Sequence, residues 1–278
     1  MYNNEEKIVI VVQARMASTR LPGKVLLPIL EQSLLARMIE RLRKVKYPVT
    51  LVIATSENEE DDLIVQEAES LDVEWFRGSQ DNVLARHYHA AKLLDADYVL
   101  KIPSDCPLID PAVVDHALDY FFRTSNKFDY VSNLHPATWP DGNDVEIMTM
   151  QCLTMAYKKA TRKLELEHTT PYIWENPDQF SIGNIVWETG KDYSMSHRFT
   201  IDYLEDYHFI KTVFEKLYPQ NPDFTCTDIV NLLDANPDIM AINTQYAGVN
   251  WYRNHLDELK TIDASQTRTT QKQTYSIF

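Results

Sequence analysis

One stretch near the N-terminus limits the fold of this chain more than any other. An unbroken apolar run, Ile8–Val12, is followed directly by a polar loop that carries Arg15, Arg20 and Lys24. A β-branched apolar run without alternation is typical of a strand that is buried on both faces, as in a parallel sheet. The loop would then leave the carboxyl end of a central strand, which is where open α/β sheets bind ligands.

The three cations of this loop suit a polyanion of triphosphate size, and Ser18 and Thr19 add further donors for phosphate oxygens. The loop is not a Walker A motif, because Lys24 is followed by Val25, and the sequence contains no Gly-x-Gly-x-x-Gly. Side chains must therefore supply what backbone amides supply in those motifs. The alternative is a cationic surface loop in which the Pro-Gly pair forms only a turn.

Apolar runs alternate with helical patterns through the first half of the chain. The runs are 49–55, 73–76 and 98–102, and such alternation indicates parallel βαβ units. From about residue 128 the pattern changes to shorter strands and polar loops. We therefore predict an α/β fold with three αβα layers, a mostly parallel twisted sheet and a small β-rich insertion at about 128–195.

Composition excludes several classes of function. The net charge of -14 argues against general affinity for nucleic acid or anionic membranes. The three cysteines are far apart and odd in number, which fits a reducing compartment, and neither CxxC nor HExxH occurs. The sequence shows no signal-peptide profile and no apolar run of membrane-spanning length. We expect a soluble, cytoplasmic protein.

Asp105 follows the predicted strand 98–102 and is flanked by prolines. A carboxylate at the end of a buried strand is well placed to bind a hard cation, and Mg²⁺ usually takes one or two carboxylates together with substrate phosphates. The alternative is a helix cap, which is the better interpretation for Asp110 before Pro111. A second acid, Asp202, ends another short predicted strand, 199–202.

The string from Ala14 to Lys24, Ala-Arg-x-x-Ser-Thr-Arg-Leu-Pro-Gly-Lys, is long and specific. It resembles the N-terminal signature of CTP-dependent cytidylyltransferases that make CMP-activated acidic sugars, most closely the branch named for spore-coat polysaccharide biosynthesis. The resemblance continues to about Leu217. It implies a sheet of the nucleotide-diphospho-sugar transferase type, a nucleotidyltransferase domain at 1–220 and a homodimer.

The resemblance also implies roles for individual residues. Lys24, Arg15 and Asp105 would be catalytic, and Asp105 and Asp202 would bind Mg²⁺ as the cofactor. The nucleotide, CTP, would be bound by Gln13, Ala14, Arg15, Ser18, Thr19, Arg20, Lys24, Arg77, Ser79 and Gln80. A small anionic acceptor would be bound by Asp144, Glu146, His168 and Arg198. His168 precedes a proline-capped helix, where a structural role is equally open, and Arg198 could instead pair with Asp202.

We therefore expect transfer of CMP from CTP to an acidic sugar of the 2-keto-3-deoxy type, for surface polysaccharide biosynthesis. A phosphate or phosphonate acceptor stays open, because it offers an oxygen that is already anionic. A glycosyltransferase is disfavoured, since the Asp-x-Asp pair at 95–97 precedes its strand. A non-catalytic nucleotide-binding protein would not require the three loop cations and both acids.

Several local expectations complete the prediction. Ser56 would cap a helix, and the strand at 181–187 would pair with another chain. Beyond residue 220 the resemblance fades into a helical extension, 221–262, with helices at 227–233 and 255–261. The polar segment 263–278 would be mobile.

Overall fold

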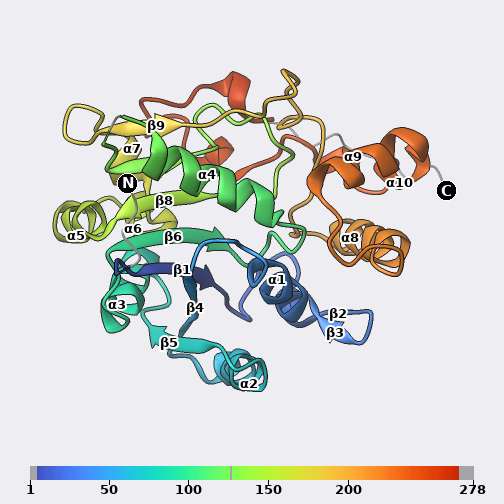
Figure 1. Ribbon diagram of the computed structural model, residues 1–278, viewed down its shortest axis with the longest axis horizontal. Coiled ribbons are helices and arrows are strands. Elements are labelled where there is room, and N and C mark those ends of the chain that lie inside the picture. The colour runs from blue at the N-terminus through green and yellow to red at the C-terminus, as the bar shows by residue number, and fades with distance from the viewer. Residues whose placement is uncertain (1–4, 126, 269–278) are drawn as a thin grey trace.

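The computed structural model describes residues 5–125 and 127–268. Its centre is a seven-stranded sheet in the order β5-β4-β1-β6-β8-β7-β9, with helices on both faces (Figure 1). The strands are β1 (Ile8–Gln13), β4 (Val49–Ser56), β5 (Glu74–Gly78), β6 (Tyr98–Pro103), β7 (Tyr130–Ser132), β8 (Glu146–Thr149) and β9 (Ile182–Asn184). Two short strands, β2 (Pro28–Ile29) and β3 (Gln32–Ser33), form a separate hairpin. The predicted α/β class with a mostly parallel sheet is confirmed.

The strand β1 lies between two parallel neighbours, β4 and β6. Its side chains alternate between two cores: Ile8 and Ile10 belong to one, and Val9 and Val11 to the other. This double burial explains why the sequence of β1 is apolar at every position. At its end Gln13 lies opposite Ala54 of β4 and Pro103 of β6, so the loop that follows leaves the carboxyl edge of the parallel sheet.

Helices form the two outer layers. The core on one side of the sheet contains residues of α1 (Leu34–Leu42), α2 (Asp62–Ser70), α4 (Pro111–Arg123), α8 (Leu204–Leu217) and α9 (Cys226–Ala235). The core on the other side contains residues of α3 (Val83–Leu93), α5 (Met150–Lys159), α6 (Lys163–His168) and α7 (Pro171–Trp174). No helix within the described ranges has both the length and the apolar character needed to span a bilayer.

The region predicted as a β-rich insertion supplies β7, β8 and β9. These strands extend the central sheet, because β8 pairs antiparallel with β6 and β7 pairs with both β8 and β9. The strand predicted at 181–187 lies at the edge of this sheet, so pairing of its outer edge with another chain stays a prediction. Its central residues form β9, and Tyr130 and Ser132 of β7 in the same chain lie opposite Ile182 and Asn184.

Two other local predictions need correction. Ser56 is the last residue of β4, and α2 begins only at Asp62, because the Ser56 hydroxyl bonds to the Asp61 carboxylate. The segment 199–202 is extended but forms no strand, since its amides bond to loop carbonyls, as Ile201 N does to the Asp105 oxygen at 2.8 Å. By contrast, Asp110 caps α4 as predicted, with its Oδ1 2.9 Å from the Ala112 amide.

The C-terminal extension is less helical than predicted. The predicted helix at 227–233 is present as α9, and α10 (Pro237–Ala241) follows it. No helix forms at 255–261, because the Glu175 carboxylate accepts bonds from the amides of Lys260 and Thr261. The structure describes residues 263–268 of the predicted mobile tail, where Arg268 N bonds to the Gly248 oxygen at 2.6 Å. The remainder, 269–278, lies outside the described residues.

Candidate active site

A cavity of about 680 Å³ opens at the carboxyl ends of β1 and β6. Small-molecule sites have volumes of roughly 300–1,000 Å³, so the cavity is large enough for a nucleotide or a sugar. Segments distant in sequence line it, among them the first loop, the loop after β6, the segment 141–146 and the C-terminal segment 248–255. The lining residues of the first loop are Gln13, Arg15, Ser18, Thr19, Arg20 and Lys24.

The two aspartates proposed as metal ligands converge on Lys24. Its Nζ lies 3.4 Å from Asp105 Oδ2 and 3.0 Å from Asp202 Oδ1, and it donates to the Ile201 oxygen at 2.6 Å. Burial opposes the charge, but the two carboxylates outweigh it and raise the pKa of Lys24. Lys24 therefore stays an ammonium between two acids that are far apart in the sequence.

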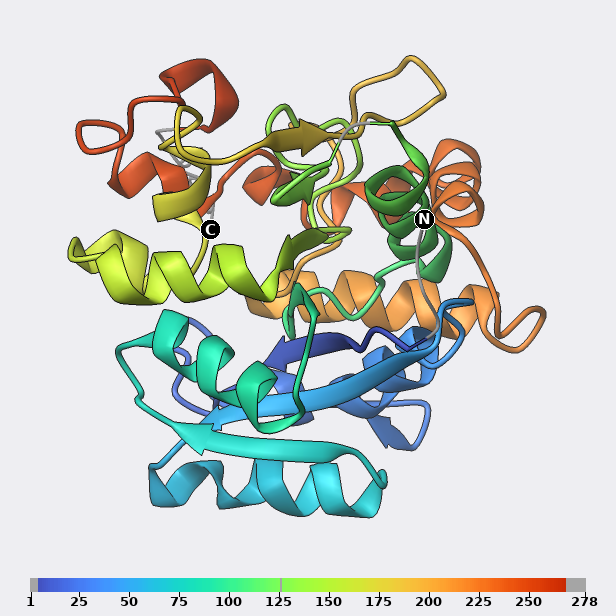
Figure 2. The same ribbon diagram turned by 60° about the vertical axis from the view of Figure 1, so that its left-hand side comes forward.

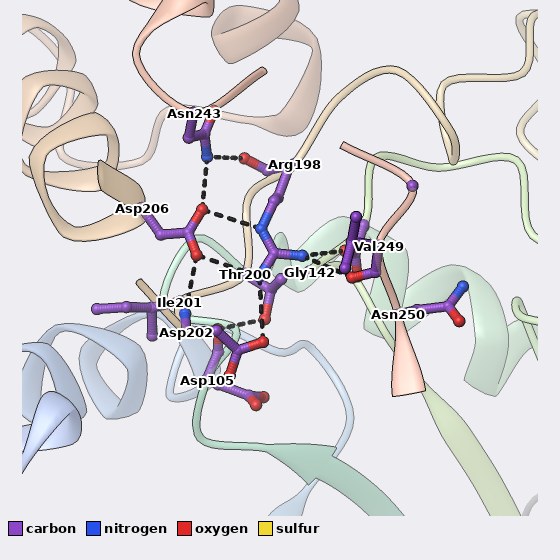
Figure 3. Close-up of polar contacts among 12 residues, drawn as sticks. Asp105, Gly142, Arg198, Thr200, Ile201, Asp202, Asp206, Asn243, Val249 and Asn250 are labelled. Carbon is purple, nitrogen blue, oxygen red and sulfur yellow. Dashed lines mark hydrogen bonds and ion pairs between the residues drawn. The ribbon is translucent and has the colours of Figure 1, made fainter. Parts of the chain in front are cut away.

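The segment 199–202 is held against the loop of Asp105, which explains the convergence. The Asp105 carbonyl accepts bonds from Ile201 N at 2.8 Å and from Thr200 Oγ1 at 3.0 Å (Figure 3). Gly142 allows this close approach: a Cβ there would lie 2.6 Å from the Thr200 nitrogen, and its φ of +111° suits glycine. The Asp-Gly pair at 141–142 thus positions Asp202.

Asp202 is fully engaged by cations. Its Oδ1 lies 2.5 Å from Arg20 Nη2 as well as near Lys24, and its Oδ2 lies 3.1 Å from Arg198 Nη2. Burial alone would raise the pKa of Asp202, but Lys24, Arg198 and Arg20 hold it well below its ordinary value. No cluster of three or more acidic, histidine or cysteine side chains in the described ranges is arranged to hold a metal.

Arg198 connects this site to the rest of the molecule (Figure 3). Its side chain is 1% exposed, and its bonds go to Asp206 at 2.9 and 3.1 Å, Asp141 at 3.2 Å, Asp202 at 3.1 Å and the Val249 oxygen at 3.1 Å. A guanidinium has five N–H donors, so all of them are engaged. Arg198 borders the cavity, but it has no donor left for the acceptor that the sequence assigned to it.

The first loop is fixed at its base and leaves Arg15 available. Ala14 N bonds to the Ala54 oxygen at 3.1 Å, and Met16 N bonds to Asp61 Oδ1 at 2.7 Å. Ala14 is buried behind the cavity rather than in its lining. Within the described part of the chain Arg15 forms no hydrogen bond or ion pair, so its guanidinium can bind an anion beside Ser18.

A further cation lies behind the loop and was missed from the sequence. Arg86 on α3 is fully buried, and none of its three nitrogens has a hydrogen-bond partner among the described residues. Burial and the nearby Arg15 lower its pKa to about 10, although Asp61 opposes the shift, so Arg86 stays charged at neutral pH. An arginine on the otherwise apolar face of a helix was the available signal.

The predicted nucleotide contacts after β5 lie outside the cavity. Arg77 bonds to the Ser56 and Asn58 carbonyls at 2.9 and 2.7 Å and forms an ion pair with Asp62. Ser79 Oγ accepts from Asn82 N at 3.0 Å, and Gln80 bonds to Asn58. These side chains brace the turn before α3, and in this region Val83 is the residue that reaches the cavity.

The predicted acceptor residues Asp144, Glu146 and His168 also line the cavity. Glu146 is buried; Lys101 outweighs the effect of burial and lowers its pKa, and Tyr130 donates to it at 2.6 Å. Burial, with Asp105 and Glu146 nearby, raises the pKa of Asp144 to about 6.

The remaining acceptor candidate, His168, is held by an aromatic contact. Its ring stacks on that of Trp251, with centroids 3.7 Å apart. Burial lowers its pKa to about 3, so the imidazole is neutral at pH 7. The sequence did not indicate that Trp251 belongs to the site.

The sequence of the fold and of most of this site matches a known protein family. Residues 9–226 match the sequence model of the family described as cytidylyltransferase. The chain belongs to the cytidylyltransferase family. This confirms the family resemblance and makes the protein a nucleotidyltransferase.

Individual relatives agree with this assignment. This cytidylyltransferase is 35% identical over 240 residues to an uncharacterized protein of Methanocaldococcus jannaschii, covering 86% of this chain and 95% of that one. It is 30% identical over 236 residues to the spore coat polysaccharide biosynthesis protein SpsF of Bacillus subtilis, covering 83% and 95%. A solved cytidylyltransferase from Leptospira borgpetersenii superposes with a TM-score of 0.79 at 34% identity, covering 84% and 97%.

Proposed function

We propose that this cytidylyltransferase transfers CMP from CTP to an acidic sugar of the 2-keto-3-deoxy type, releasing pyrophosphate, in the biosynthesis of a surface polysaccharide. The observation that carries the proposal is the convergence of Asp105 and Asp202 on Lys24, beside Arg15 and Arg20. The resemblance of the first loop to enzymes that activate acidic sugars supports this class of acceptor.

In this proposal the first loop binds the triphosphate. Arg15 has no partner among the described residues and lies in the cavity lining with Ser18 and Thr19. Transfer of a nucleotidyl group depends on positioning and charge neutralisation rather than on a covalent enzyme intermediate. A cavity lined by both cationic and carboxylate side chains meets this requirement without a nucleophilic side chain.

Asp105 and Asp202 fit a single Mg²⁺, because their carboxylates already share one cation, the Lys24 ammonium. Mg²⁺ commonly binds one or two carboxylates together with substrate phosphates. When bound, it would neutralise charge on the reacting phosphates. Arg20 and Lys24, which pair with Asp202 in the structure, would then bind the β and γ phosphates.

A pyrophosphate-release assay tests the function. The protein is incubated with CTP, with and without Mg²⁺, and with members of three acceptor classes: sugar acids, phosphosugars and phosphonates. We expect release with CTP and a sugar acid, and we expect EDTA to abolish it. Release with only a phosphosugar or a phosphonate would show that this compound, and not a sugar acid, is the acceptor. No release with any acceptor would contradict the proposed reaction.

The assay also has a matched control and a companion measurement. Arg123→Ala removes an arginine that is 73% exposed on α4, and it should leave the rate unchanged. The predicted homodimer is measured separately, by light scattering during gel filtration.

A further inference from the structure

The far wall of the cavity comes from the C-terminal extension. Residues 248–255, with Ser265 and Gln266, line it, although the match to the family ends at residue 226. In Figure 2 this red segment lies beside the yellow segment that includes α7, far from it in sequence, and the rings of Trp251 and Trp174 lie 6.5 Å apart. The extension therefore contributes to the lining of the cavity.

This wall is joined to the active site by specific contacts. The Val249 carbonyl accepts from Arg198 at 3.1 Å, as Figure 3 shows, and Asn250 Nδ2 bonds to the Gln266 oxygen at 3.0 Å. Trp251 stacks on His168. The short helix η4 (Trp251–Asn254) is thus held in a defined position at the cavity.

The charges of the lining distinguish one residue of this wall. Most of the lining cations already have carboxylate partners, namely Arg20, Lys24, Lys101 and Arg198. In the part of the chain that the structure describes, Arg15 and Arg253 form no such pair. Arg15 belongs to the first loop, where phosphates would bind, so Arg253 is the cation available on the C-terminal segment of the lining.

We propose that Arg253 binds the carboxylate of the acidic-sugar acceptor and that Trp251, through its stack on His168, positions η4 for this contact. The proposal rests on the proposed function and names the residue that selects the acceptor. A guanidinium matches a planar carboxylate with two parallel hydrogen bonds.

A carboxylate suits this half of the cavity better than a phosphate dianion does. Asp144, Glu146 and Glu167 also line it, and their charges repel an anion more strongly as its own charge increases. Among the described residues one arginine without a partner faces them. A single negative charge on the acceptor is therefore the better match.

The test is a kinetic comparison of Arg253→Ala and Arg253→Lys with the wild type. The acceptors are 3-deoxy-manno-octulosonate and N-acetylneuraminate, each paired with its carboxamide. For the acid that the wild type uses, Arg253→Ala should raise the acceptor KM at least tenfold, with kcat and the KM for CTP within about twofold. Arg253→Lys should recover part of the loss, and the preference for acid over carboxamide should shrink in Arg253→Ala.

The outcomes separate this inference from the proposed function. If the wild type uses a sugar acid and Arg253→Ala leaves its KM unchanged, the assignment of Arg253 is wrong while the function stands. A rise in the KM for CTP equal to that for the acceptor would also overturn it. If the wild type uses only phosphosugars or phosphonates, both the acidic-sugar acceptor and the carboxylate contact are refuted. Arg123→Ala again serves as the control.

Discussion

Asp206→Asn is a direct perturbation of the network that positions Asp202. Asp206 is fully buried and accepts five hydrogen bonds: two from Arg198, one from Asn243, and one each from the amides of Asp202 and Tyr203. The substitution keeps the shape of the side chain but removes its charge. It also places an amide N–H₂ group, which is itself a donor, against N–H donors, because all five groups that contact Asp206 donate hydrogen bonds to it.

The expected loss of stability follows from the burial of the ion pair between Arg198 and Asp206. The side chains of Arg198 and Asp206 are 1% and 0% exposed, so solvent cannot replace the lost carboxylate. Breaking a buried ion pair by removing one partner typically costs about 3–5 kcal/mol. Arg198 retains Asp141 and Asp202, so we expect the lower part of this range. At about 2 °C per kcal/mol for a chain of this size, Tm should fall by about 6–8 °C.

Urea unfolding followed by circular dichroism measures the effect, with Asp81→Asn, an exposed position, as the matched control. The variant should also release pyrophosphate more slowly, because Asp202 loses the carboxylate that orients its backbone. A free energy of unfolding within about 1 kcal/mol of the wild type would show that the network does not stabilise the site as we describe.

Three further predictions concern single side chains. Lys24→Ala should lower kcat/KM for CTP roughly 30- to 1,000-fold, which corresponds to about 2–4 kcal/mol of transition-state stabilisation. Unchanged kinetics would show that the loop is a simple surface turn. The neutral His168 imidazole stabilises the fold fully above pH 6.5 and progressively less as the pH falls toward 3. In urea titrations, the free energy of unfolding of the wild type relative to His168→Gln should therefore decrease by about 2 kcal/mol between pH 7 and pH 5. An equal difference at both pH values would contradict this, and His208→Gln is the exposed control. Arg86→Met removes a buried cation without a partner among the described residues, and calorimetry should show stability unchanged or raised by up to about 3 kcal/mol; a clear loss would reveal a partner for Arg86.

The sequence predicted the parts of the site that depend on local pattern. The apolar run of β1 and the polar loop after it are adjacent in the chain, so their places at the sheet edge follow from the strand alone. Asp105 was placed by the same argument, at the end of β6. The role of Asp202 came only from the resemblance, because its contact with Lys24 spans 178 positions in sequence.

The remaining features depend on long-range contacts that no local pattern contains. The turn carrying Arg77 has the composition of a binding loop, but Asp62 and two carbonyls take up its guanidinium. Arg198 was expected at the acceptor, yet three aspartates from different segments surround it. The wall at 248–255 has neither helical nor strand periodicity, so no local pattern places it in the cavity.

The central claim is that two aspartates, brought together by the fold, act on the phosphates held by the first loop. The measurement that tests it most directly is pyrophosphate release from CTP by Asp105→Asn, with Mg²⁺ and the acceptor that the wild type uses best. Asp105→Asn should reduce release at least 1,000-fold, about 4 kcal/mol, while its Tm stays close to that of the wild type. Near-normal turnover in this variant would contradict the account.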